Sequence, residues 1–193
     1  MGIATQKIEV HWNYFLALES DLDRISRYVE FDEENFKCFS IEIARVLMAS
    51  AAEVDVVCKQ LCKKIDPEAA ESINQYRYRI KRVYPDIHGF EVLLPRYGLK
   101  LKPWSKWRGN TGVPLWWTAY NKIKHHRDSE YYQGNLKNAL NSVAGLFVMV
   151  LYLYKEKAEL GELVPSPQLL RVTEEHFGGT TYGDFEFGIN YRL

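Results

Sequence analysis

The 193-residue sequence lacks most of the features that mark a specialised class of protein. It has only three cysteines, too few for a disulfide framework, so we expect a cytoplasmic protein in a reducing environment. Its longest uncharged run is residues 138–154, shorter than the roughly 20 apolar residues of a membrane-spanning helix. We therefore expect the central helix of a soluble bundle and no membrane partner. Residues 1–12 show no signal-peptide pattern, so no targeting segment is expected.

Common catalytic and metal-binding motifs are also missing. Gly109-Asn110-Thr111-Gly112 lacks the lysine that completes a phosphate-binding loop, and no G-x-S-x-G or Glu-x-x-His spacing occurs. Cys58 and Cys62 could share a helix face, but without a second ligand pair they are interpreted as buried thiols. We expect no metal or cofactor. Three carboxylates of the second predicted helix are interpreted as ion-pairing groups, with Arg45 or with the basic helix as partners: Glu42, Glu53 and Asp55.

Hydrophobic spacing predicts an all-α, up-and-down bundle of four to five helices. Ser40 is suited to cap the second helix, and Gly and Pro interrupt a long loop that could hold a short hairpin near 91–101. Residues 1–176 are expected to form a single helical domain with this loop as an insertion, and 177–193 a Gly/aromatic arm that is either strand-like or a partly ordered end. The predicted helices cover about 12–31, 40–65, 67–83, 113–127 and 134–160, and the loop covers 86–112.

The formal net charge of zero hides two regions of opposite sign. Residues 96–127 hold eight of the 25 Lys and Arg and no Asp or Glu, so this basic window carries +8 and the rest of the chain −8. The window also contains four of the five tryptophans. Cations among exposed aromatic rings suit single-stranded nucleic acid, because cations hold phosphates and rings stack on unpaired bases. The expected strand-guiding residues are Trp104, Trp107, Lys106 and Arg108. The alternative is that the tryptophans belong to the core and the cations to a solvated face.

A histidine motif lies at the end of the basic window, in the sequence Tyr120-Asn121-Lys122-Ile123-Lys124-His125-His126-Arg127. Asn121 and His125 are one helical turn apart and share a face, whereas His126 points about 100° away from His125. An amide can orient a phosphate oxygen, a histidine can transfer a proton at neutral pH, and neighbouring cations can offset phosphate charge. The alternative is that His125 is a surface or capping residue.

The motif resembles that of the HEPN superfamily, small all-α domains that include many endoribonucleases of prokaryotic defence and toxin systems. Their usual motif is Arg, a polar residue, three variable residues and His. Asn121 and His125 match the polar and histidine positions, but Tyr120 replaces the arginine. Lys124 or Arg127 could supply the missing cation, although a bidentate guanidinium is not simply exchanged. The resemblance implies catalytic roles for Asn121 and His125, with substrate bound by Tyr120, Lys122, Lys124, His126 and Arg127.

The resemblance implies a homodimer that binds single-stranded RNA or a nucleotide, with two motifs across one cleft. Metal-independent RNA cleavage follows if the motif is active. An antitoxin-like protein is a further expected partner, for the acidic remainder of the chain. The Tyr120 departure supports a second interpretation, a catalytically inactive nucleotide-binding, nucleic-acid-binding or protein-interaction module. In a third interpretation the Trp-rich loop is a docking site within a larger complex.

Overall fold

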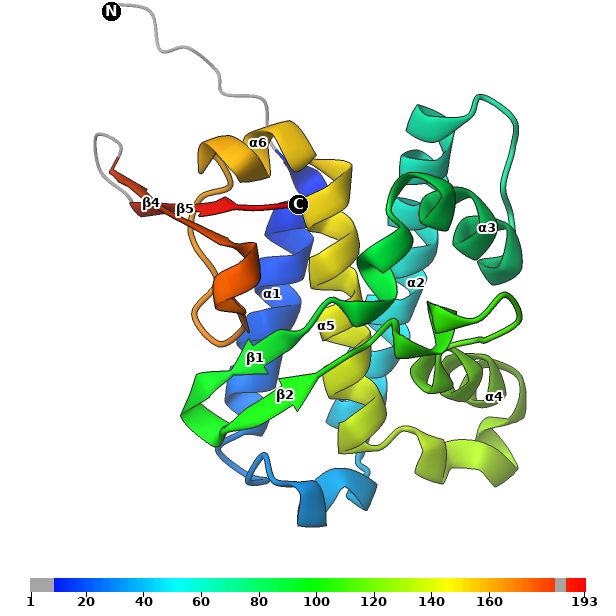
Figure 1. The fold of residues 1–193 in the computed structure, drawn as a ribbon. Coiled ribbons are helices and arrows are strands. Elements are labelled where there is room, and N and C mark those ends of the chain that lie inside the picture. The colour runs from blue at the N-terminus through cyan, green and yellow to red at the C-terminus, as the bar shows by residue number, and fades with distance from the viewer. Residues whose placement is uncertain (1–8, 183–186) are drawn as a thin grey trace, which may run out of the picture.

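The structure is a computed structural model that describes residues 9–182 and 187–193 (Figure 1). Helices, with the short 3₁₀ helices included, make up 64% of this described part, which contains six α-helices and two small antiparallel sheets. The prediction of a mainly helical fold is correct, but the fold is not purely α. The first eight residues of the N-terminal segment and Phe185 of the predicted C-terminal arm lie outside the described residues.

Helix α5 (Leu136–Leu153) occupies the centre of the fold, between α1 (Val10–Ile25) and α2 (Ile41–Ile65) (Figure 1). Among the described helices it alone is long and apolar enough to cross a membrane, yet 89% of it is buried inside the protein. The prediction of a core helix here is confirmed. Ser142 on α5 accepts a 2.7 Å hydrogen bond from Ser50 on α2, which satisfies both hydroxyls in the core.

Helix boundaries follow the local capping groups. Ser40 caps α2 as predicted, because its Oγ accepts the Ile43 N–H at 3.2 Å. Helix α3 (Ile73–Val83) begins six residues after the predicted Pro67, because Ser72 is the cap that accepts from the Gln75 N–H. Similarly, α1 ends before the predicted Phe31.

The predicted last helix is divided in two. Tyr154, with φ −106° and ψ 34°, leaves the helical conformation between α5 and α6 (Lys155–Leu160). The remaining helix, α4 (Leu115–Glu130), lies across α5 from the C-terminal strands (Figure 1).

The loop between α3 and α4 contains the predicted hairpin. Strands β1 (Val92–Leu94) and β2 (Leu99–Leu101) pair antiparallel around Gly98, whose φ of 64° suits glycine. A third strand that the sequence did not predict, β3 (Arg171–Val172), pairs with the other edge of β1. The loop is therefore part of a small sheet, and the short 3₁₀ helix η4 (Ser105–Arg108) follows it.

In its described part the C-terminal arm is strand-like, which is one of the two forms expected for it. Strands β4 (Phe177–Tyr182) and β5 (Phe187–Tyr191) pair antiparallel. Tyr191 is 3% exposed and its ring lies edge-on to Phe147 of α5, with centroids 6.1 Å apart. This contact joins the last strand to the helical core.

Candidate functional site

The histidine motif lies on the exposed side of α4, in the part of the helix that precedes a break. Asn121 and His125 are both exposed, and the helix is interrupted only at His126, where φ is −139° and ψ 47°. The two candidate catalytic side chains therefore keep the helical one-turn spacing that places them on one face. The rings of His125 and His126 are 6.4 Å apart and inclined by 58°, consistent with separate directions.

Tyr120, at the arginine position of the motif, is mostly part of the core. It is 9% exposed and packs on Trp117 with ring centroids 5.7 Å apart. The amine of Lys124 lies 5.7 Å from the Tyr120 ring, a cation–π distance. Little of Tyr120 is therefore accessible to a substrate, contrary to its predicted role, and its ring instead contacts Lys124, the cation one turn along the helix.

The tryptophans of the loop are core residues, so the predicted stacking platform is wrong. Trp104 and Trp107 are both 0% exposed, and their ring centroids are 4.2 Å apart. Trp104 donates its indole N–H to the Gly145 carbonyl at 3.2 Å, and Trp116 donates to Pro103 at 3.0 Å. Burial of large aromatic rings contributes strongly to the stability of a fold. Gly145 of α5 has no side chain that would obstruct these rings. These rings therefore fix the loop to α5 and cannot stack on a base or dock a partner in this conformation.

The cations of the basic window differ in their pairing. Arg96 pairs with Asp23 at 3.3 Å and Lys122 with Glu130 at 3.2 Å. The other six are exposed and make no salt bridge to any carboxylate in the described part of the chain: Lys100, Lys102, Lys106, Arg108, Lys124 and Arg127. Lys122 is thus committed to an ion pair, which weakens its predicted role in substrate binding.

Of the six unpaired cations, two face acidic neighbours. Lys100 and Lys102 line a hollow of about 400 Å³ together with Glu91, Glu174 and Glu175. The remaining four lie on η4 and α4, which are held together by the edge-on contact of Trp104 with Trp116, 5.2 Å between centroids. We call Lys106, Arg108, Lys124 and Arg127 the free cation set. From Trp116 to His125 the helix rises about 14 Å at 1.5 Å per residue.

A mainly apolar groove of about 910 Å³ separates α2 from the end of α4. Its polar groups are Arg45, Arg127 and Asp128. Arg45 is held by Glu42 at 2.8 Å, the ion pair that the sequence predicted, and also by Asp21 at 3.2 Å. The apolar lining consists of Ile41, Ala44, Met48, Ala49 and Tyr131. The groove therefore begins two residues beyond His125.

The sequence did not predict a partly buried polar cluster that joins α1 to α2. The Nδ1 of His11 lies 2.5 Å from the Glu53 carboxylate, and its Nε2 lies 2.7 Å from the Gln60 amide nitrogen. Glu53 thus pairs with His11 and not with the predicted basic partners. The only sign of this cluster in the sequence was His11, a histidine next to the apolar Trp12. Asp55 is in an ion pair as predicted, but its partner is Lys59 of the same helix, at 2.5 Å, and not Arg45 or the basic helix.

The His11 cluster borders a hollow of about 1050 Å³ whose cations are already bonded. Lys64 donates to the Leu153 carbonyl at 2.6 Å, and Lys157 pairs with Glu9 at 2.6 Å. Because both nitrogens of His11 are also engaged, we interpret this cluster as a structural connection between helices.

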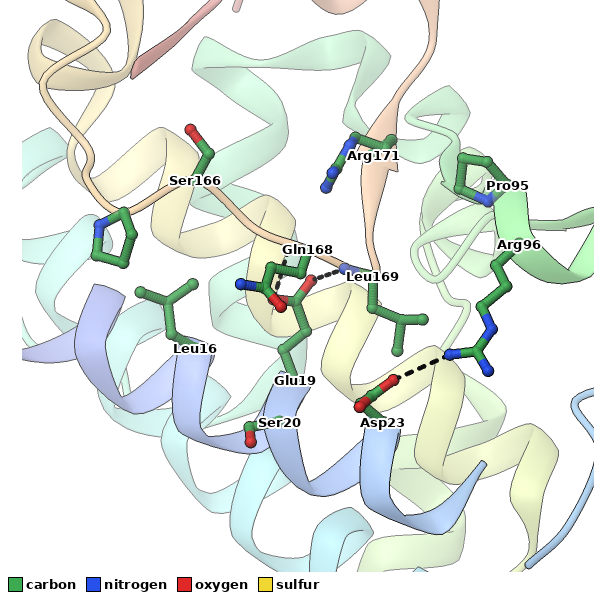
Figure 2. Close-up of a pocket in the computed structure, with 11 residues that line it drawn as sticks. Leu16, Glu19, Ser20, Asp23, Pro95, Arg96, Ser166, Gln168, Leu169 and Arg171 are labelled. Atoms are coloured by element: carbon green, nitrogen blue, oxygen red, sulfur yellow. Dashed lines mark hydrogen bonds and ion pairs between the residues drawn. The ribbon is translucent and has the colours of Figure 1, made fainter. Parts of the chain in front are cut away.

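A second hollow, of about 520 Å³, lies between α1 and the segment that leads into β3 (Figure 2). Glu19 is 4% exposed and points at that segment, where its carboxylate accepts the backbone N–H groups of residues 168–170 at 2.8–2.9 Å. Asp23 and Arg96 pair across the opening (Figure 2). The guanidinium of Arg171 donates to the carbonyls of Pro167 and Leu170. These polar groups hold the chain together and leave few donors for a ligand.

The cysteines of α2 are buried thiols, as predicted. Cys58 and Cys62 are both 0% exposed. Burial raises the pKa of Cys58 well above its usual value and that of Cys62 to about 11. Within the described residues, no group of three or more His, Cys, Asp or Glu side chains is arranged to hold a metal ion.

Comparisons with known proteins give no relative for this chain: no family model matches the sequence, and no curated protein or solved structure matches it. The choice of site therefore depends on the geometry. Within residues 9–182 and 187–193, the face of α4 with Asn121 and His125 is the one place where an exposed amide, an exposed imidazole and unpaired cations occur close together in the sequence.

Proposed function

We propose that the protein binds single-stranded RNA at α4 and cleaves it without a metal ion, as a cytoplasmic HEPN-like homodimer of a prokaryotic defence or toxin system. The observation that supports this most strongly is the exposed Asn121–His125 pair, with the exposed Lys124 and Arg127 next to it in the sequence. Neither cation has a carboxylate partner among the described residues, so both are available to a phosphate.

In the proposed reaction the RNA supplies its own nucleophile. The 2′-oxygen attacks the adjacent phosphorus, the bond from phosphorus to the 5′-oxygen breaks, and a 2′,3′-cyclic phosphate and a 5′-hydroxyl result. The 2′-hydroxyl loses one proton and the leaving oxygen gains one. His125 transfers one of these protons, Asn121 donates to a non-bridging phosphate oxygen, and Lys124 and Arg127 stabilise the developing negative charge.

A dimer would supply the second proton-transfer group. One chain offers a single suitable histidine on this face, whereas two copies of the motif across a cleft offer one for each proton. The same arrangement would double the free cation set along the RNA. We further propose that the acidic remainder of the chain, at −8, receives an antitoxin-like protein.

The test is cleavage of labelled single-stranded RNA in EDTA. We expect wild type to cleave, and His125→Ala and Asn121→Ala each to lose at least about 100-fold in rate, as is usual on removing a proton-transfer group or a donor to the oxygen that gains negative charge. His88→Ala is the matched control, because His88 lies on the 3₁₀ helix Pro85–Gly89 and bonds the Pro85 carbonyl at 3.0 Å. Equal background cleavage by wild type and His125→Ala would refute the nuclease.

A second candidate function is binding without catalysis. The observation that favours it is Tyr120, a mostly buried residue where an active motif has arginine. RNA or nucleotide binding that weakens with salt but gives no product would support this inactive module. Sedimentation of the purified chain tests the homodimer in either case.

A further inference from the structure

The groove between α2 and α4 has one carboxylate on its rim that the fold does not use. Asp128 is exposed and makes no hydrogen bond or salt bridge with any residue of 9–182 or 187–193. Of the two arginines in the lining, Arg45 is already held by Glu42 and Asp21, and Arg127 makes no salt bridge with any described residue. An unpaired carboxylate beside an apolar surface is suited to receive N–H donors from a ligand.

The rest of the groove offers surfaces for a flat ring. Ile41 is 75% exposed, and the side chains of Met48 and Ala49 continue the apolar wall along α2. On the opposite side, the ring of Tyr131 is held edge-on by Phe39, with centroids 5.8 Å apart. A hollow of about 910 Å³ is large enough for a nucleobase. Aromatic and apolar side chains are the usual contacts for an unpaired base in RNA recognition.

The break in α4 places this groove directly after the motif. His125 is the last residue before the non-helical His126, and Arg127 and Asp128, the next two residues, line the groove. A strand with its phosphate at His125 would therefore have its neighbouring base beside the groove. Arg127 would lie between the phosphate and the base.

The carboxylate selects among the four bases by its hydrogen-bonding pattern. A carboxylate accepts two parallel N–H bonds and donates none when ionised. Guanine presents N1–H and N2–H side by side on one edge. Adenine and cytosine each place a ring-nitrogen acceptor next to their amino group, and uracil flanks its N–H with two carbonyls, so each of these bases would place an acceptor atom against the carboxylate.

We propose that the α2–α4 groove is a nucleobase pocket that selects guanine next to the scissile phosphate, with Asp128 as the specificity-determining residue. This inference rests on the proposed RNA function and adds a sequence preference to it. Bidentate base recognition typically discriminates by 1–3 kcal/mol, which corresponds to about five- to 150-fold in affinity.

The experiment measures binding separately from cleavage. Short uridine-rich RNAs carry guanine, inosine or adenine at one position, and deoxyribose throughout the central residues removes the nucleophile. We expect wild type to bind the guanine strand at least about fivefold more tightly than the adenine strand, with inosine intermediate because it lacks the N2 amino group. Asp128→Asn should reduce the guanine-to-adenine ratio to about one. Asp86→Asn, an exposed residue outside the groove with the same charge change, should leave it unchanged.

Two results would overturn the proposal. One is a guanine-to-adenine ratio near one in wild type, or a ratio that Asp128→Asn leaves unchanged. The other is a Met48→Glu variant that is a monomer where wild type is a dimer and that still prefers guanine. Because Met48 lines the groove, this result would mean that a second copy of the chain covers the groove and that guanine binds elsewhere. A guanine preference without any cleavage of all-ribose RNA would refute the nuclease and support the pocket, whereas cleavage without base preference would do the reverse.

Discussion

At the scale of single residues, the three cysteines differ in environment although they are chemically identical. Cys58 and Cys62 are completely buried, and burial raises the pKa of Cys62 to about 11, so it stays protonated near neutrality. Cys38 is only partly buried. We expect one thiol per chain to react quickly with a disulfide reagent at about pH 7.5 and still only one at about pH 9.

The two α2 thiols should become reactive only when the chain unfolds. Cys38→Ser is the control, because it should remove the fast phase and leave the slow one intact. Three fast thiols in the folded protein would contradict the burial of α2. As an acid whose pKa is raised by folding, Cys62 also binds its proton more tightly in the folded state, so its contribution to stability falls as pH rises above about 9.

The environment of a residue could be predicted from the sequence where helical spacing determines it, but not where packing against distant segments does. The shared face of Asn121 and His125 follows from helical periodicity alone, and the structure retains it. The burial of Trp104 could not be read this way, because a basic, aromatic loop has the same composition whether its rings face solvent or the core. The partner of Glu53 is His11, 42 residues away in the chain, and only the fold brings them together.

At the scale of elements, the contact between α5 and the loop depends on Gly145. A Cβ atom at this position would lie 3.0 Å from Cζ2 of Trp116 and 3.5 Å from Cζ2 of Trp104. We expect Gly145→Val to lower the free energy of unfolding by about 1–3 kcal/mol, because overpacking a filled core displaces side chains. Urea denaturation followed by tryptophan fluorescence measures this change.

The control for this substitution is Ala52→Val on the exposed side of α2. This control should lower the free energy of unfolding by only a few tenths of a kcal/mol, the cost of a β-branched residue in a helix, because it introduces no steric contact. Equal loss of stability in both variants would mean that the tryptophan rings do not restrict Gly145.

Elements whose ends are fixed by a local group were predictable. Ser40 caps α2 where the sequence placed it, and the hairpin around Gly98 forms within the predicted range. The start of α3 was misplaced because the prediction began the helix at Pro67, whereas the residue that caps it is Ser72. Strand β3 was not predicted, since its pairing with β1 spans about 80 residues of chain and a two-residue strand has no periodicity to detect.

At the scale of the whole molecule, the zero net charge divides into a basic window of +8 and a remainder of −8. The structure shows that the cations of the basic window are not equivalent. Arg96 and Lys122 are in ion pairs, whereas the free cation set is not. A local group of unpaired cations can attract a polyanion although the average charge is zero. The affinity for RNA should therefore depend on salt through a few named residues.

Each phosphate neutralised on a single strand contributes about −0.7 to the slope of log affinity against log salt concentration. Replacing Lys106 and Arg108 with alanine together should therefore make the slope shallower by about 1.4. The matched control is Lys155→Ala with Lys157→Ala, which removes the same charge from residues paired with Glu159 at 3.5 Å and Glu9 at 2.6 Å. Fluorescence anisotropy with one uridine-rich RNA over a range of salt concentrations gives both slopes. If the two double variants change the slope equally, RNA responds to the total charge of the molecule and the free cation set has no special role.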